Sequence, residues 1–81
     1  MEYPKDFFVR LEGESFLDGR ITVNWSKQGF SVEVALVQKE SRKIHKHIDT
    51  MYYFSEEREA IDRGVQRLAR FITEIKISSQ N

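Results

Sequence analysis

The sequence predicts an α+β fold, in which an antiparallel three- to four-stranded meander packs against one C-terminal amphipathic helix. For the sheet, residues 20–25 and 30–37 alternate between apolar and polar side chains, the pattern of strands that bury one face. For the helix, apolar residues between 61 and 75 recur at spacings of three and four. The 81 residues suffice for one hydrophobic core, and no repeat or linker divides them, so residues 1–81 are expected to form a single domain.

Residues 14–49 are expected to form the antiparallel sheet. The Asp18-Gly19 pair predicts a tight hairpin turn, since a type I′ turn requires positive φ at both central positions. The strand that follows places Ile21, Val23 and Trp25 on the core face. A second turn is expected at residues 26–29, with glycine at its end. The next strand then directs inward the side chains of Phe30, Val32, Val34 and Leu36.

A third turn is expected at residues 38–43, followed by a strand over residues 44–49. Alternation places Ile44 and Ile48 on one face of that strand and three polar residues on the other, namely His45, His47 and Asp49. Lys46 falls on the apolar face, which favours an edge position or a β-bulge. Two arrangements remain open for residues 1–13: they form an extra strand, or they cover the sheet as an additional segment.

A helix is expected over residues 55–77. Ser55 is suited to the N-cap, and the carboxylates of Glu56 and Glu57 complement the positive end of the helix dipole. Gly64 lowers helix propensity by about 1 kcal/mol relative to alanine, so its place beside the apolar stripe predicts a close approach to the sheet, beneath Trp25 or Phe30. Residues 78–81 are expected to fray. The stripe itself consists of Ile61, Val65, Leu68, Ile72 and Ile75.

The composition and the absence of known motifs argue against several classes of function. Thirteen basic and thirteen acidic side chains cancel, which removes the usual electrostatic argument for nucleic-acid binding. The chain has no cysteine, so no disulfide or thiolate chemistry is expected, and a small fold of this kind is typical of the cytoplasm. We expect no signal peptide and no membrane span. No glycine-rich phosphate loop or nucleophile elbow is present either, and we predict a protein without enzymatic activity.

Two short motifs mark the helix: Tyr53-Phe54-Ser55-Glu56-Glu57 at its start and Ala69-Arg70-Phe71-Ile72 inside it. Together with the order of strands and helix, they resemble a group of small bacterial β-β-β-α domains of unknown function. The resemblance covers roughly residues 19–72 and implies a fold, but no activity, cofactor or functional residue. This chain departs from the pattern in its longer N-terminal segment and in Arg58-Glu59 ahead of Ala60.

The candidate metal site consists of His45, His47 and Asp49. Alternate side chains of a strand project to one face about 6.5–7 Å apart, so two imidazoles and a carboxylate could meet a zinc-like ion. The chain offers no obvious fourth ligand, and the same spacing occurs in any polar strand that faces solvent. We favour the polar strand and predict neither a metal nor a cofactor.

A basic segment at residues 39–47 supports an alternative function. It carries a net charge of +3 and could contact phosphates through Lys39, Arg42, Lys43 and Lys46. An exposed Trp25 or Tyr52 could add base stacking, as proteins that bind single strands use. Against this, Trp25 is in phase with the core, and residues 1–18 carry a net charge of −3 that could neutralise the segment within the fold.

The helix carries further basic residues, Arg63, Arg67 and Arg70, which lie between Glu59 and Glu74 in the sequence. This spacing indicates ion pairs between residues i and i+4 on a solvated helix face. We therefore do not assign these arginines to phosphate binding.

Protein association is the predicted function. A sheet with one helix leaves a face or an edge uncovered, and several apolar residues do not obviously fit one core: Phe8, Ala35, Val37, Met51 and Tyr52. Exposed apolar surfaces mark partner sites, and free edges accept strands from a partner. Coverage of this face by residues 7–11 is equally consistent with the sequence. We predict a non-enzymatic accessory or interaction domain that meets a protein partner or a second copy of itself, with weak binding of single-stranded nucleic acid as the alternative.

Overall fold

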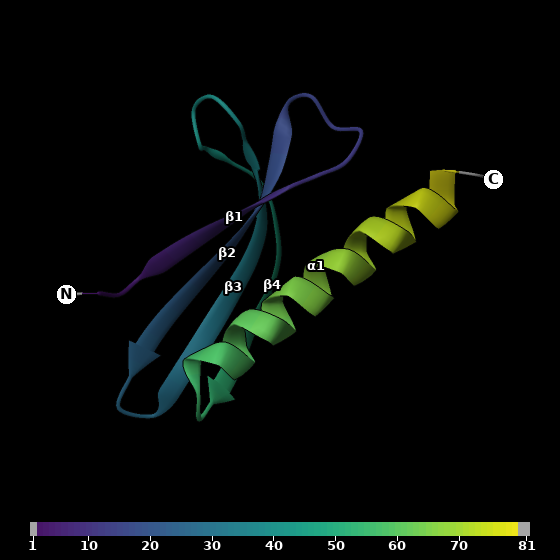
Figure 1. Cartoon of the computed structure of the whole chain (residues 1–81). Helices are drawn as coiled ribbons and strands as arrows, with labels where there is room; N and C mark the ends of the chain where they lie inside the picture. Colours follow the sequence, from purple (N-terminus) through teal and green to yellow (C-terminus); the bar gives the residue numbers. More distant parts are fainter. Residues whose placement is uncertain (1, 80–81) are drawn as a thin grey trace.

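One sheet and one helix that crosses a single face of it make up the structure (Figure 1). This computed structural model describes residues 2–79, with side chains described for residues 2–75. The strands are β1 (Lys5–Arg10), β2 (Leu17–Ser26), β3 (Gly29–Gln38) and β4 (Ile44–Phe54), and the helix is α1 (Glu57–Ser79). Each strand pairs antiparallel with the next, in the order β1-β2-β3-β4. The predicted fold, a meander packed against one C-terminal helix, is confirmed.

Several boundaries differ from those expected. β1 joins the sheet as an edge strand, paired with residues 18–23 of β2, and does not lie over the sheet. β4 continues beyond Asp49 to Phe54. α1 begins at Glu57, two residues after Ser55, and the Glu56 carbonyl accepts a hydrogen bond from the Ala60 N–H at 3.2 Å. Of residues 78–81, the first two belong to α1, and the last two lie outside the described residues.

The turn predicted at Asp18-Gly19 is wrong. Both residues lie inside β2, paired with β1 on one side and with β3 on the other. Residues 11–16 connect β1 to β2 instead, and Gly13 supplies the left-handed backbone there with φ of 82°. Gly19 has a packing role, because a Cβ at this position would lie only 2.5 Å from the Leu68 Cδ2 of α1. A glycine inside a strand can thus mark a close contact as well as a turn.

The core lies between α1 and the inner face of β2 and β3, where the fully buried side chains are Ile21, Val23, Val32 and Val34. Gly64 of α1 sits at its centre: a Cβ there would lie 2.9 Å from a methyl carbon of Ile21 and 2.9 Å from one of Val32. The predicted close approach of Gly64 to the sheet is confirmed. The residues beneath it are Ile21 and Val32, not Trp25 or Phe30.

Trp25 is exposed, contrary to its expected place in the core. It follows Ile21 and Val23 on the same face of β2, but it remains 54% exposed. It pairs with Phe30 beside the β2–β3 turn, at the end of the sheet. A residue in phase with the core is buried only where the helix lies above it, and α1 leaves this corner uncovered.

Two of the apolar residues expected at an uncovered face are in fact buried. Ala35 and Val37 have no exposed surface, although both lie on the face of the sheet opposite α1. Arg20 of β2 and His47 of β4 flank Ala35, and the side chain of Arg20 is only 18% exposed. The stems of long polar side chains can cover small apolar neighbours in this way, so neither residue is available to a partner.

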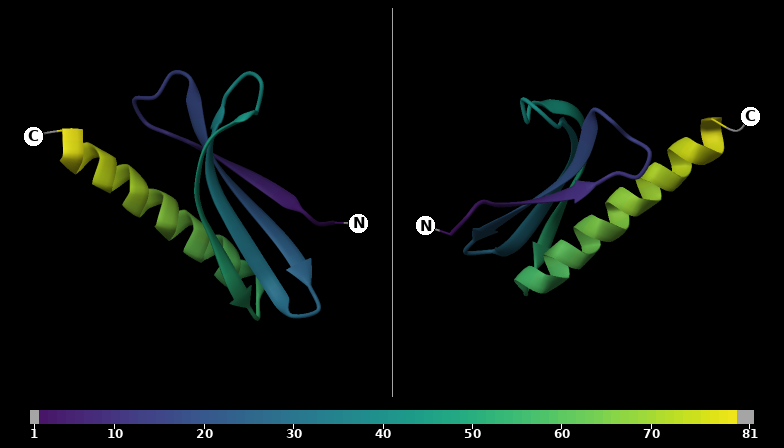
Figure 2. Two further views of the ribbon diagram at one scale, coloured as in Figure 1. Left: turned by 180° about the vertical axis from the view of Figure 1, so that it is seen from behind. Right: turned by 45° about the horizontal axis from the view of Figure 1, so that its top comes forward.

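The C-terminal half of α1 extends past the sheet, as Figures 1 and 2 show from three directions. The N-terminal half packs on β2, β3 and β4 and buries Ala60 and Leu68. Val65 and Ile75, farther around the helix, remain 44% and 46% exposed. The predicted apolar stripe from Ile61 to Ile75 is therefore only partly used by the core.

We expect Gly64→Ala to destabilise the protein. Alanine raises helix propensity by about 1 kcal/mol, but its methyl group would meet the buried methyls of Ile21 and Val32, and overpacking a core costs about 1–3 kcal/mol. The net loss in the free energy of unfolding, measured in urea, should be about 1 kcal/mol. Gln66→Ala, at an exposed position of the same helix, is the control and should change it by less than about 0.5 kcal/mol. A more stable Gly64→Ala variant would contradict the close contact.

Candidate functional site

The basic segment lies in the β3–β4 turn and the first residues of β4. Asp18, whose side chain is 15% exposed, forms ion pairs with Lys39 Nζ at 3.8 Å and with Arg42 Nη1 at 3.6 Å. Lys43 and Lys46 are exposed. One carboxylate from the acidic N-terminal region thus pairs with two of the four candidate phosphate-binding cations and offsets one unit of their charge, as the charge distribution in the sequence suggests.

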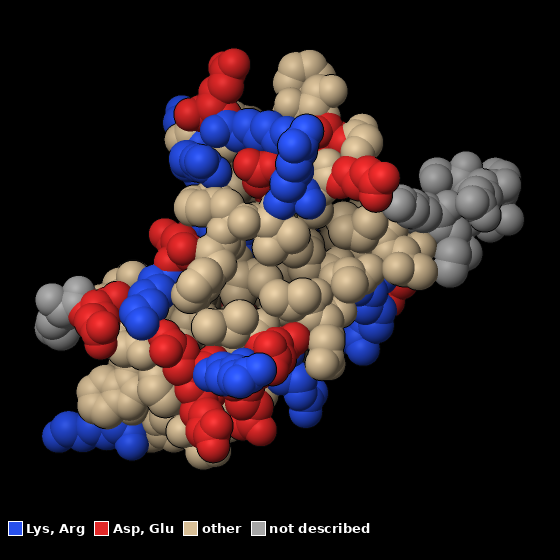
Figure 3. Space-filling view, viewed as in Figure 1, with Lys and Arg blue, Asp and Glu red and all other residues tan. Residues whose placement is uncertain are grey.

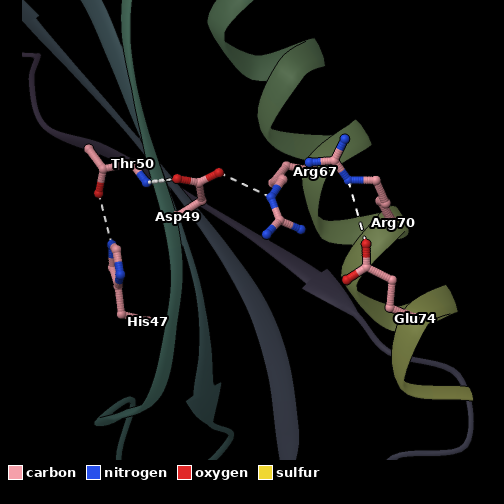
Figure 4. A network of polar contacts seen from close by, with 6 residues as sticks. All are labelled: His47, Asp49, Thr50, Arg67, Arg70 and Glu74. Carbon is pink, nitrogen blue, oxygen red and sulfur yellow. Dashed lines mark hydrogen bonds and ion pairs between the residues drawn. The ribbon is translucent and has the colours of Figure 1, made fainter. Parts of the chain in front are cut away.

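The structure does not place His45, His47 and Asp49 on one face, contrary to expectation. The register of β4 against β3 shifts at His45 and again at Ile48, as β-bulges do, and each shift interrupts the alternation. Asp49 consequently faces α1, whereas the His47 Nε2 lies 2.8 Å from the Thr50 hydroxyl on the opposite side of the strand (Figure 4). Within residues 2–79, no three His, Cys, Asp or Glu side chains gather in a way that could hold a metal ion.

The second of these shifts creates a polar link between sheet and helix. Asp49 accepts a hydrogen bond from Arg67 Nε at 3.0 Å and another from the Thr50 N–H at 2.8 Å (Figure 4). The hydrogen bond from Arg67, assisted by the Thr50 N–H, holds the pKa of Asp49 below its ordinary value. The expected pairing within the helix is therefore wrong for Arg67, although Arg70 does lie 3.9 Å from Glu74 at i+4.

A shallow pocket of about 230 Å³ lies beside this link, lined by Met51, Arg63, Gln66, Arg67 and Arg70. The Nη1 nitrogen of Arg67 is buried there without a hydrogen-bond partner among the described residues. The pocket could hold a small oxyanion. However, the ion pairs to Asp49 and Glu74 already offset much of its positive charge.

β1 carries three apolar residues between charged ones, and within residues 2–79 it pairs with β2 alone, which leaves its other edge free. Phe7 and Phe8 point to opposite faces and remain 38% and 44% exposed. On the outer face, Asp6 accepts a hydrogen bond from the Thr22 hydroxyl at 2.6 Å, and the Arg42 guanidinium lies 4.0 Å from the centre of the Phe8 ring. Exposed apolar edges of this kind invite pairing with another strand.

The N-terminal end of β1 is fastened to the start of α1. Lys5 Nζ lies 2.9 Å from Glu57 Oε1. This hydrogen-bonded ion pair raises the pKa of Lys5 and lowers the pKa of Glu57. The contact fixes one end of the edge strand against the helix, and at the other end Val9 and Leu11 pack in the same cluster as Leu68 of α1.

A groove of about 570 Å³ lies between β1, the β1–β2 loop and the part of α1 from Val65 to Ile75. We call it the β1–α1 groove. Its walls are mainly apolar and include Val9, Leu11, Leu17, Val65, Ile72 and Ile75, with Glu12 and Glu14 on the loop side. Figure 3 shows an uncharged surface across the middle of the molecule, between groups of charged side chains above and below it.

The sequence reasoning missed this groove because it assigned the whole helical stripe to the core. One signal was available: the run Phe7-Phe8-Val9 is apolar on both faces, which an edge strand of a single sheet cannot bury. Two other apolar residues did not obviously fit into one core. Of these, Met51 packs against the core, while Tyr52 is 62% exposed.

We expect acid to weaken the link between Asp49 and Arg67. Because the folded protein has the lower pKa at Asp49, the ionised carboxylate stabilises the fold above the unfolded value of about 3.9. That stabilisation disappears as the pH falls through the folded value. Asp49→Asn should therefore flatten the decline of the unfolding free energy between about pH 5 and pH 2, measured by urea unfolding. Asp62→Asn, on the exposed side of α1, is the control, and an Asp49→Asn curve parallel to wild type would contradict the assignment.

Comparisons with known proteins assign the chain to no family. No protein-family model matches it, and neither the curated proteins nor the solved structures give a significant match. Within residues 2–79, no helical segment combines the length and the apolar character that crossing a bilayer requires. The resemblance to β-β-β-α domains stays a prediction, and function is inferred from the geometry described above.

Proposed function

We propose that this protein is a non-enzymatic interaction module, whose binding surface is the β1–α1 groove together with the free edge of β1. The observation that carries this proposal is the exposure of large apolar side chains on that surface. Phe7, Val65 and Ile75 remain 38%, 44% and 46% exposed, although each belongs to a regular strand or helix. Contiguous apolar surfaces of this kind are typical of sites that bind other proteins.

The shape of the groove supports a protein partner. Its volume of about 570 Å³ accommodates several side chains, and it is open along the helix, as an extended or helical segment requires. Each large apolar side chain that a partner covers fully contributes roughly 1.5–3 kcal/mol. Covering Val65 and Ile75 would therefore supply a useful part of a binding free energy.

The alternative, binding of single-stranded nucleic acid, has weaker support. The basic segment begins in the β3–β4 turn, whereas Trp25 lies beside the β2–β3 turn. Successive turns of a meander lie at opposite ends of the sheet, so Trp25 cannot stack a base whose phosphate reaches that segment (Figure 1). Asp18 also neutralises Lys39 and Arg42 in place.

We expect the protein to pass unretained through immobilised single-stranded DNA at about 0.15 M salt, because the chain carries no net charge and Asp18 offsets part of the charge of the basic segment. Lys43→Glu combined with Lys46→Glu should leave that profile unchanged. Retention that falls with salt in the wild type and disappears in the double variant would support the nucleic-acid alternative instead.

A cross-linking experiment tests the proposed function directly. A photo-activated residue in place of Val65 should capture a discrete protein in cells, either a different chain or a second copy, because Val65 lines the groove. The same residue in place of Glu59, an exposed polar position of α1, is the control and should capture none. The absence of a discrete product from positions 65, 72 and 75 alike would exclude the groove as a binding surface.

A further inference from the structure

We propose that the partner at the free edge of β1 is a second copy of this chain, joined by antiparallel pairing of the two β1 strands. The inference rests on the proposed interaction function and names its partner. β1 has both properties that such a joint needs: an edge without a partner strand, and exposed aromatic side chains at Phe7 and Phe8. A two-fold axis through such a pair brings the same residues of each copy together.

The order of side chains along β1 selects the register of the pair. When Phe8 lies opposite Phe8 of the second copy, Asp6 lies opposite Arg10 of the second copy, and this happens twice by symmetry. Phe7 then lies opposite Val9 of the second copy. Directly opposed pairs of this kind, aromatic with aromatic and acid with base, stabilise antiparallel sheets.

Other registers lose this complementarity. A shift of one residue would place the inner face of one strand beside the outer face of the other. A shift of two residues would place either Asp6 or Arg10 opposite the Phe8 ring, depending on its direction. Of these registers, only the centred one pairs Asp6 with Arg10 and sets Phe7, Phe8 and Val9 opposite apolar side chains, while Lys5 lies opposite Leu11 at the end of the strand.

The charged groups are available for this contact. Arg10 is exposed, and so is Asp6. Only one carboxylate oxygen of Asp6, Oδ1, accepts the hydrogen bond from the Thr22 hydroxyl, which leaves Oδ2 for a guanidinium. Both residues lie on the outer face, away from α1, where no helix blocks an approaching copy.

Pairing of the two β1 strands would also extend the apolar surface on the α1 face of the sheet. Phe7 and Val9 lie on the α1 face of β1, opposite Ile21 and Gly19 of β2. In the centred register, the same side chains of the second copy continue that face. The two β1–α1 grooves would then border one continuous sheet, with a helix on either side of the joint.

Sedimentation velocity of the full chain tests the inference. An edge of six residues is a small interface, so we expect a dissociation constant on the order of 10–100 µM. Asp6→Arg and Arg10→Asp should each weaken the dimer by about 10-fold or more, because each change places like charges opposite one another twice. Glu59→Arg and Arg70→Asp make the same charge changes on α1 and should leave the dimer unchanged.

A mixture of the two β1 variants gives the sharper result. Asp6→Arg and Arg10→Asp carry opposite charges at the facing positions, so an equal mixture should form a one-to-one dimer that neither forms alone. The double variant should dimerise within about 3-fold of wild type, because it exchanges the charges without losing the pairing. Circular dichroism checks that each variant folds. If Asp6→Arg does not, Asp6→Asn keeps a partner for Thr22 and should still weaken the dimer about 3-fold.

The outcomes separate this inference from the proposed function. A wild-type protein that stays monomeric at about 1 mM overturns the inference. A dimer that the β1 variants leave unchanged, or a mixture no tighter than its components, overturns it as well. In each case, capture of a different protein from Val65 would leave the proposed function standing. If the protein neither dimerises nor gives a cross-linked product from Val65, the inference and the proposed function are both wrong.

Discussion

The close approach of α1 to the sheet is the constraint on which the rest of the structure depends. Two glycines permit it, Gly64 on the helix and Gly19 on β2, and a Cβ at either would lie within 3 Å of an apolar side chain across the interface. Attractive contacts between apolar atoms weaken quickly as a gap opens, so the missing side chains allow Ile21 and Val32 to be fully buried. Because both contacts fall on β2 and β3, the helix is held over the middle of the sheet.

This placement explains why β1 is left exposed. α1 packs on β2, β3 and β4, so a single helix in this position leaves the side chains of β1, at the edge beside β2, partly exposed. The ion pair between Lys5 and Glu57 holds the N-terminal end of β1 to the start of α1, and Val9 packs in the same cluster as Leu68. The β1–α1 groove lies beside these contacts, between β1, the β1–β2 loop and α1. The exposed apolar surface is thus a consequence of how the helix docks.

The polar side chains that look available in the sequence are largely engaged within the fold. Asp18 lies inside β2 and meets Lys39 and Arg42. Asp49 is turned toward α1 by an irregularity in β4 and meets Arg67. Such contacts fix the relative position of elements more than they stabilise the fold, because partly exposed ion pairs contribute little. They also engage two cations of the basic segment, Lys39 and Arg42, and one carboxylate of the candidate metal site, Asp49.

The sequence by itself determined the features that depend on neighbouring residues: the alternation over residues 30–37, the turn at 26–29 and the helix period. It also indicated that Gly64 lies close to the sheet, but not which residues Gly64 meets there. Only the tertiary structure decided the others. The role of Gly19 could not be predicted, because the absence of a side chain suits a glycine both to a tight turn and to a close contact between elements. The alternation of β2 predicts which face of the sheet carries Trp25, but not whether another element covers that side chain. The irregular register between β3 and β4, which places Asp49 on the helix side, also depends on the partner strand. For the groove, the apolar stripe was visible in the sequence, but the fraction of it that the core uses depends on where one rigid helix lies across four strands.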